Sequence, residues 1–369
     1  MSIKGNRVVN NTARKELTSR FDNTEFTALL EFSTRLGRNP LLVQASNGNT
    51  SIKLDGILWI KASGTWLEHA LQEKNFVPVD LARAREAIRT HSVVPRIVGT
   101  VLSLKPSIET AMHVVLPHRV VAHVHSINAI AWAVRRDAPE HLAERLAGMR
   151  WQWVPYSASG APLAGQIEKV LSYAPETDVF VLANHGVVVC GEDCAMVEAL
   201  LFEMERRLEI HPRVSPEPEA ALSAVISRSP EWCLPIFRGM HALATDSVSR
   251  TILKGGILYP CLAMFLGPKI RMLPHSVPLS RFAEYSNGRD GQRTFVIVED
   301  AGVILNKQIT VEQRATLVAL ARITQRIDES APLRYLTPSE VTAILNEDQH
   351  AYQLTKESGN EASAAAHPS

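Results

Sequence analysis

The sequence predicts a soluble α/β protein with two domains. Its 369 residues are 46% hydrophobic and 21% charged, which is an ordinary globular composition and enough chain for two cores. Segments with apolar residues at helical spacing occur along the chain together with short β-branched runs, a pattern typical of α/β proteins. A proline-rich segment, HPRVSPEPE at 211–219, follows a long helical pattern and indicates a boundary between the domains.

We expect five consecutive parts along the chain. The last is small and polar, with nothing to bury, which is typical of a disordered tail. The second domain is predicted to be a smaller α/β unit without a catalytic motif. The parts are an N-terminal extension at 1–22, a catalytic domain at 23–211, a linker at 212–219, the second domain at 220–355 and the tail at 356–369.

Amphipathic helices are predicted in both domains. Apolar residues recur there three and four positions apart, which places them on one face of a helix. The last helix also begins with a capping-box pattern, formed by Thr310 and Gln313. The predicted segments are 24–36, 81–90, 109–116, 129–149, 193–208 and 311–327.

Short strands separate several of these helices. Residues 52–62 predict two strands joined by a tight turn, because Asp55-Gly56 supplies the positive φ that such turns need. Residues 120–124 are short and β-branched, which is typical of a buried strand. VFVLANHGVVV, at 179–189, predicts a strand, a polar turn and a second strand.

The second domain repeats this last pattern. FVIVEDAGVIL, at 295–305, is again strand, polar turn with glycine, and strand, and it also leads into a helix. The acidic pair Glu299 and Asp300 is expected where the first copy has Asn184 and His185. We interpret the repeat as a degenerate duplication and the acidic pair as a solvated turn.

Composition excludes several classes of partner. Lys and Arg number 39 against 38 Asp and Glu, so no global field attracts nucleic acid or a membrane surface. No stretch approaches the roughly 18 to 20 apolar residues of a membrane helix, and no apolar run follows the basic N-terminus as in a secretory signal. Four scattered cysteines indicate reduced thiols and a cytoplasmic location. A small substrate remains as the expected partner.

Three histidines form a candidate metal site. His123 and His125 are two residues apart in VVAHVHS, and alternate residues of a strand project from the same face. His185 lies at the junction of two apolar segments, where Gly186 permits close backbone approach. Three imidazoles leave coordination positions free, as catalytic zinc requires. The alternative is that they are hydrogen-bonded core histidines, since His-x-His pairs also occur without metal.

A carboxylate and two polar turns complete the candidate site. Glu109 comes shortly before the histidine pair, and a carboxylate beside a metal-bound carbonyl can remove a proton. The alternative is a first-turn glutamate that only favours the helix dipole. His113, four residues on, is interpreted as structural or supporting. The turns NGNTS, at 47–51, and KASGT, at 61–65, suit phosphate or carboxylate oxygens, although such sequences are also common in plain turns.

The order of these motifs is more specific than any one of them. NGNTS, KASGT, PSIE, HVHS, VPY and NHGVVVCG resemble, in order and spacing, the class II aldolase/adducin family, over residues 23–210. The resemblance implies a three-layer α/β/α sandwich around a largely antiparallel sheet. It also implies a homo-oligomer, commonly a tetramer.

The resemblance also implies roles for particular residues. His123, His125 and His185 correspond to the metal ligands, with Zn²⁺ as the implied cofactor and Mn²⁺ or Co²⁺ as alternatives. Glu109 corresponds to the acid/base carboxylate, and Tyr156 to a proton donor that reaches a neighbouring subunit's site. The positions that hold a substrate phosphate in the sugar-phosphate aldolases are Gly48, Asn49, Ser63, Gly64 and Ser107.

The chain departs from this family in three places. Ile108 follows Ser107 where fuculose-phosphate aldolase relatives have a second serine, which removes one phosphate ligand. The length and the LYPCLAMFLG segment are most similar to the aldolase part of rhamnulose-phosphate aldolase/short-chain dehydrogenase fusions. In those proteins Asp follows LYP, where this chain has Cys261. No dinucleotide fingerprint is present, so no dehydrogenase is expected.

The implied activity is that of a metal-dependent aldolase of carbohydrate metabolism. It would cleave a ketose, with or without a phosphate group, through a metal-stabilised enediolate. The same chemistry in this family also supports 4-epimerisation of sugar phosphates and decarboxylation of 3-oxo acids. A non-catalytic, adducin-like interaction module is the alternative from another class, although a scaffold has no need for the three histidines and Glu109.

Overall fold

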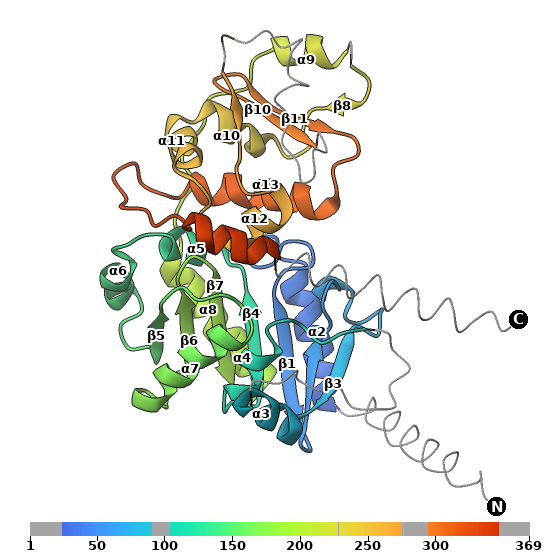
Figure 1. The fold of residues 1–369 in the computed structure, drawn as a ribbon, viewed down its shortest axis with the longest axis vertical. Coiled ribbons are helices and arrows are strands. Elements are labelled where there is room, and N and C mark those ends of the chain that lie inside the picture. Colours follow the sequence, from blue (N-terminus) through green and yellow to red (C-terminus); the bar gives the residue numbers. More distant parts are fainter. Residues whose placement is uncertain (1–23, 91–103, 228, 275, 277–293, 347–369) are drawn as a thin grey trace, which may run out of the picture. The chain divides into compact units, whose positions relative to one another are not determined.

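The computed structural model describes residues 24–90, 104–227, 229–274, 276 and 294–346. The chain divides into two compact units, shown in Figure 1: Met1–Ala133 with Asp137–Ile210, and Val134–Arg136 with His211–Ser369. The predicted N-terminal extension and polar tail lie outside the described residues. Within the described ranges, no helix combines the length and the apolar character needed to cross a bilayer.

A seven-stranded sheet forms the centre of the first unit. Its strand order is β3-β2-β1-β4-β7-β6-β5. Every neighbouring pair is antiparallel except β5 and β6, which are parallel. The strands are β1 (Asn49–Leu54), β2 (Ile57–Lys61), β3 (Phe76–Asp80), β4 (Val120–Val124), β5 (Trp151–Val154), β6 (Val179–Leu182) and β7 (Gly186–Gly191).

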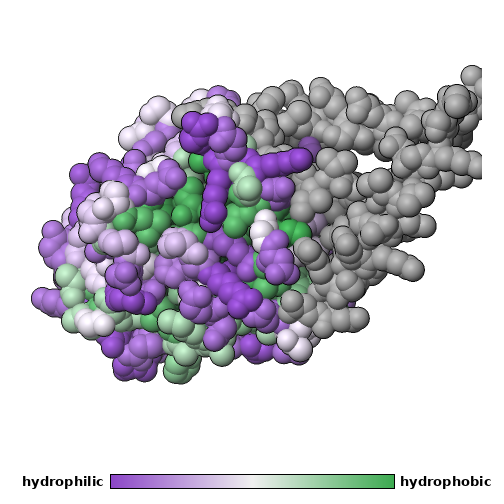
Figure 2. All heavy atoms as spheres, turned by 90° about the horizontal axis from the view of Figure 1, so that it is seen from below, coloured by the Kyte–Doolittle hydropathy of each residue, from purple (hydrophilic) through white to green (hydrophobic). Residues whose placement is uncertain are grey.

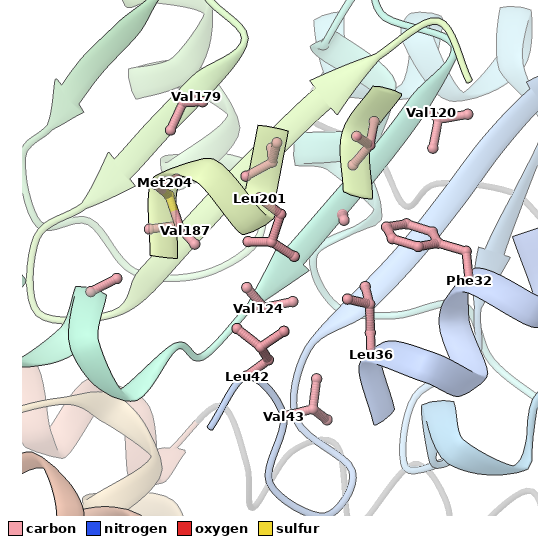
Figure 3. Close-up of a cluster of buried hydrophobic side chains, with 14 of the residues drawn as sticks. Phe32, Leu36, Leu42, Val43, Val120, Val124, Val179, Val187, Leu201 and Met204 are labelled. Carbon is pink, nitrogen blue, oxygen red and sulfur yellow. The ribbon is translucent and has the colours of Figure 1, made fainter. Parts of the chain in front are cut away.

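Helices cover both faces of this sheet. They are α2 (Thr24–Gly37), α3 (Leu81–Arg89), α4 (Thr110–Val115), α5 (Ile127–Ala133), α6 (Ala138–Arg145), α7 (Ala161–Tyr173) and α8 (Cys194–Leu208), with a 3₁₀ turn, η1, at Leu67–His69. Val120 and Val124 of β4 pack with α2 and α8, as Figure 3 shows, whereas Val121 packs with α4 and α7. Alternate strand residues therefore feed two cores, and the predicted three-layer sandwich is confirmed.

The sequence also predicted most of the local boundaries. The hairpin of β1 and β2 turns at Asp55 and Gly56, whose φ angles are 49° and 76°. Both values lie in the left-handed region that a tight hairpin turn requires. The prediction for 120–124 matches β4 residue for residue.

One predicted helix is wrong. Residues 129–149 form two helices, α5 and α6, instead of one. Between them, residues 134–136 pair with residues 332–334 of the second unit's chain segment, through backbone bonds that end helical bonding. Pro139 then lies in the first turn of α6, where its missing N–H costs nothing.

The second unit contains a four-stranded sheet with the order β8-β11-β10-β9. The predicted capping box of Thr310 and Gln313 is present at the start of its last labelled helix. The labelled elements are α9 (Ala221–Ile226), β8 (Trp232–Cys233), η2 (Arg238–His241), α10 (Ala242–Thr245), α11 (Ser247–Gly255), α12 (Pro260–Leu266), β9 (Met272–Leu273), β10 (Phe295–Val298), β11 (Gly302–Asn306) and α13 (Val311–Thr324).

The repeated hairpin is real, but its alignment differs by one residue from the prediction. Both turns contain three residues between the paired ends of the strands, and the middle residue has a positive φ: 53° at Asn184 and 61° at Asp300. Asp300 therefore matches Asn184, and Ala301 stands where the first copy has His185. The second hairpin lacks the candidate metal ligand.

The surface mixes polar and apolar side chains. On the face drawn in Figure 2, hydrophilic residues surround separate, smaller groups of apolar ones. Large exposed apolar side chains include Leu71, after η1, Tyr173, at the end of α7, and Phe202, on α8. Because these three come from different elements, they need no common explanation.

The core of the first unit predicts a clear contrast between two phenylalanines. Phe32 of α2 is fully buried, whereas Phe202 of α8 is 72% exposed. Phe32→Ala should lower the free energy of unfolding by about 3–5 kcal/mol, because it leaves a cavity. Phe202→Ala, the matched control, should change it by less than about 0.5 kcal/mol. Urea unfolding checks both, and equal losses in the two variants would contradict the packing described.

Candidate metal centre and acid–base group

Strand β4 directs two histidines to one face of the sheet. Val121 packs against α4 and α7, and His123 follows it by two residues, so both project to the same side. His125 comes two residues later, just after β4 ends. In the antiparallel register, His123 lies opposite Asn49 of β1 and Val188 of β7. The centre of the sheet therefore fixes the backbone beneath the site.

The hairpin of β6 and β7 supplies the third histidine. Its turn is formed by residues 183–185, and Asn184 adopts the left-handed conformation that asparagine tolerates well. At the next position, a Cβ on Gly186 would lie 2.5 Å from the Val124 carbonyl oxygen and 3.4 Å from the rings of His123 and His125. Only glycine lets the hairpin approach β4 this closely.

The three imidazoles meet in the interior of the unit. One nitrogen from each of His123, His125 and His185 lies within 4.8 Å of the other two, and all three residues are buried. The Nε2 atoms of His123 and His125 are 3.1 Å apart. His123 donates its Nδ1–H to the Val187 carbonyl oxygen at 3.0 Å, so its Nε2 presents a lone pair to the cluster.

The protonation of the cluster suits metal binding. Burial, with a smaller effect from neighbouring imidazoles, holds the pKa of His125 well below its ordinary value. Burial likewise lowers the pKa of His185 to about 4, against a smaller opposing effect of Glu109. Both rings are therefore neutral at pH 7, the form that ligates metals. Two nitrogens bound tetrahedrally to zinc lie about 3.3 Å apart, so the spacing also fits.

Glu109 closes the cluster from the start of α4. Its Oε1 lies 3.3 Å from Nε2 of His185, and its Oε2 lies 3.4 Å from Nε2 of His123. The Asn49 amide nitrogen donates to Oε2 at 2.7 Å, and the Ser159 hydroxyl donates to Oε1 at 3.4 Å. The carboxylate is thus held against the imidazoles by partners on two other segments.

The carboxylate stays ionised despite its burial. Burial alone would raise the pKa of Glu109, but the facing imidazoles of the cluster and the Asn49 amide together lower it below its ordinary value. Lys61 is buried as well, and burial lowers its pKa to about 8 while Glu109 opposes that shift. Its ammonium donates to the backbone carbonyls of Ser46, at 3.0 Å, and Ala62, at 3.4 Å.

The predicted substrate-binding residues fall into two groups. Asn49 and Ser107 lie at the cluster: Ser107 Oγ accepts from the Asn49 amide at 3.3 Å and from the Glu109 backbone N–H at 3.2 Å. Gly48 is packed beneath, where a Cβ would be 2.9 Å from the His123 carbonyl oxygen. Ser63 and Gly64 follow β2, and Gly64 has open space around its Cα.

The loop after β5 contains Tyr156 and a residue that sequence reasoning missed. Tyr156 is half-buried and lies three residues before Ser159, whose hydroxyl reaches Glu109. The signal for Ser159 was weak, because SASG has the composition of any polar loop. Asn49 was predicted as a substrate contact, and its bond to Glu109 adds a second role that only the fold reveals.

Comparison with known families accounts for this arrangement. Residues 28–211 match the model described as Class II Aldolase and Adducin N-terminal domain. This part of the chain belongs to the class II aldolase/adducin family. The class II aldolases generally use a divalent metal, and the histidine triad found here can bind one.

Individual relatives of this class II aldolase domain are distant. An uncharacterized oxidoreductase, YuxG of Bacillus subtilis (strain 168), is 28% identical over 177 residues, a match that spans 43% of this chain and 25% of that protein. The similarity therefore covers about a quarter of the curated relative's length.

Solved structures similar to the chain are class II aldolase-like domains. An N-terminal class II aldolase domain from Thermoplasma acidophilum is 20% identical, with a TM-score of 0.45, over 50% of this chain and 92% of that one. For L-fuculose-1-phosphate aldolase from Thermus thermophilus the values are 18%, 0.36, 50% and 91%. For YgbL from Klebsiella pneumoniae, a putative aldolase/epimerase/decarboxylase, they are 23%, 0.38, 50% and 86%.

The close approach at Gly186 can be tested directly. Gly186→Ala should push the hairpin away from Val124 and displace His185, so bound zinc should fall to a small fraction of the wild-type content. Gly165→Ala in α7 is the matched control, because a Cβ there meets nothing within 4 Å. Metal analysis of both purified variants checks the contrast. Full zinc content in Gly186→Ala would contradict it.

The buried histidines should make stability depend on pH in the metal-free protein. His113, His125 and His185 have folded pKa values below the ordinary 6.5, about 3 for His113 and about 4 for His185. The unfolded chain then binds protons below pH 6.5 that the folded chain excludes. The free energy of unfolding should therefore fall between pH 7 and 5, by about 2 kcal/mol for each such histidine.

Urea unfolding in the presence of a chelator measures this slope. The Glu109 carboxyl does not contribute in this range, because its folded pKa is lowered from 4.5 and its stabilisation is lost only below that pH. Replacing His69, whose side chain is 46% exposed, by Ala should leave the slope unchanged. Equal stability at pH 7 and 5 would show that the buried rings are not held neutral.

Proposed function

We propose that this protein is a metal-dependent lyase that cleaves a carbon–carbon bond of a ketose or ketose phosphate. The metal ligands are His123, His125 and His185, and Glu109 is the acid/base group. Zn²⁺ is the proposed ion, with Mn²⁺ and Co²⁺ as alternatives. Membership of the class II aldolase/adducin family is consistent with this proposal.

One observation carries the proposal: electron-rich atoms converge in a buried space. The lone pair of His123 Nε2 faces the Nε2 atom of His125 at 3.1 Å and an oxygen of Glu109 at 3.4 Å. Neutral imidazoles and a carboxylate repel one another in this arrangement unless a cation lies among them. A purely structural cluster gains nothing from it, which argues against a non-catalytic interaction module.

A divalent ion in this set would polarise a substrate carbonyl and offset the negative charge that develops on its oxygen. Glu109 can accept the hydroxyl proton whose loss starts retro-aldol cleavage, because it is ionised and lies beside the ligand nitrogens. The C–C bond then breaks, and its electron pair remains on the carbonyl fragment until that carbon is protonated. We propose Tyr156 or Glu109 as the donor.

Substrate contacts and assembly are part of the same proposal. Ser63 and Gly64 flank an open turn, and Gly48, Asn49 and Ser107 lie next to the acid/base group, so a phosphate or hydroxyl end of the sugar would be held there. Tyr156 is proposed to serve the site of a neighbouring subunit. The active form is therefore proposed to be a homo-oligomer, with a tetramer as the first candidate.

A substrate panel tests the reaction. Ketose phosphates, free ketoses and 3-oxo acids are each incubated with the full chain and with zinc, manganese or cobalt supplied separately. Release of an aldehyde supports the lyase. Formation of an epimeric sugar phosphate alone, or release of CO₂ alone, overturns it in favour of an epimerase or a decarboxylase.

Three variants separate metal binding from chemistry. His123→Ala should lose both bound metal and turnover, whereas His69→Ala, at a partly exposed histidine, should keep both. Glu109→Gln should keep the metal and lose about 10²–10⁴-fold in kcat, because the amide cannot accept the proton. Unchanged metal content in His123→Ala would remove the basis of the assignment.

A further inference from the structure

A chain of buried hydrogen bonds ends at the acid/base carboxylate. His113, on α4, is fully buried, and its Nδ1 lies 2.7 Å from the Ser51 hydroxyl oxygen. Its Nε2 lies 2.5 Å from Oδ1 of Asn49. The amide nitrogen of the same Asn49 reaches Oε2 of Glu109 at 2.7 Å. The order is therefore Ser51, His113, Asn49, Glu109.

The direction of each hydrogen bond follows from the carboxylate. An ionised carboxylate only accepts, so the Asn49 side-chain group that faces Glu109 must be the NH₂. Its oxygen then faces His113 and needs a donor, which can only be Nε2–H. A neutral imidazole carries one N–H, so Nδ1 accepts from the Ser51 hydroxyl. Every donor and acceptor in the chain has one role.

The sheet provides the geometry for this chain. Asn49 and Ser51 are alternate residues of β1, so both project toward the side covered by α4. One imidazole can therefore bond to both side chains at once. Burial, which is the largest effect, lowers the pKa of His113 to about 3, against a smaller opposing effect of Glu109.

We propose that His113 is a positioning residue that sets the orientation of the Asn49 amide and, through it, the place of Glu109. With the opposite tautomer, a lone pair of His113 would face the Asn49 oxygen. The amide would then turn over and point its oxygen at the carboxylate, which loses a donor and gains a repulsion. The proposal deepens the proposed function and rests on it, because the positioned group is the proposed acid/base.

The tautomer can be read without any turnover. Full-length, zinc-loaded protein is labelled with ¹⁵N at histidine, and long-range ¹H–¹⁵N correlation spectra are recorded at pH 7. The His113 signals are assigned by their loss in His113→Gln. We expect a protonated Nε2 and an unprotonated Nδ1. The opposite tautomer, or an imidazolium, overturns the proposal.

Three variants test the positioning. His113→Leu leaves Asn49 without a donor, and kcat should fall about 10²-fold, with KM changed less than about threefold and zinc content kept. His113→Gln can donate from its amide to Asn49 and should recover at least about tenfold of that loss. Ser51→Ala, which removes only the bond to Nδ1, should lose less than His113→Leu.

A crystal structure of His113→Leu gives a readout that is independent of the reaction. The Asn49 amide should be turned over or displaced, and its 2.7 Å bond to Glu109 should be lost. An unmoved Asn49 amide, wild-type kcat in His113→Leu, or equal loss in the Leu and Gln variants overturns the proposal. If the wild type cleaves none of the substrates, the proposed function fails, while the spectrum and this structure still decide the role of His113.

Discussion

The pairing of β4 with β1 on one side and β7 on the other is the constraint on which the site depends. It sets His123 opposite Asn49, so the residue that holds the carboxylate and a proposed metal ligand project to the same face. On the other side, it brings the start of β7 so near that Gly186 has room for no side chain. A shift of one residue in either pair would turn these groups to opposite faces.

The cost of this arrangement is electrostatic. A carboxylate, an ammonium and three imidazoles are buried in one region, where unpaired charge is strongly disfavoured. The protein limits that cost in two ways. It keeps His125 and His185 neutral, and it gives Glu109 and Lys61 polar partners of their own. The two valine-rich cores on either side of the sheet provide the compensating stability.

Much of this site was predictable because its signals are local. The i, i+2 spacing of His123 and His125 requires only that the segment be a strand, and the Asn-His-Gly turn requires only a hairpin. The orientation of Asn49 was not predictable, since it depends on His113 and Glu109, which are some 60 residues away and meet it only through the register of β1. Helix 129–149 failed for the same reason: backbone partners at 332–334 end it, and they are remote in sequence.

The second hairpin shows what a turn contributes and what it cannot. Around Asp300 the backbone repeats the conformation found at Asn184, so an Asx residue followed two positions later by glycine is enough to shape the turn. There Glu299 and Asp300 form ion pairs with Lys254 and Arg250, at 2.9 and 2.6 Å, in place of a metal-ligand set. The strand beside β11 is β8, which carries no histidine. The candidate metal site therefore arises from the neighbouring strand β4 as much as from the hairpin itself.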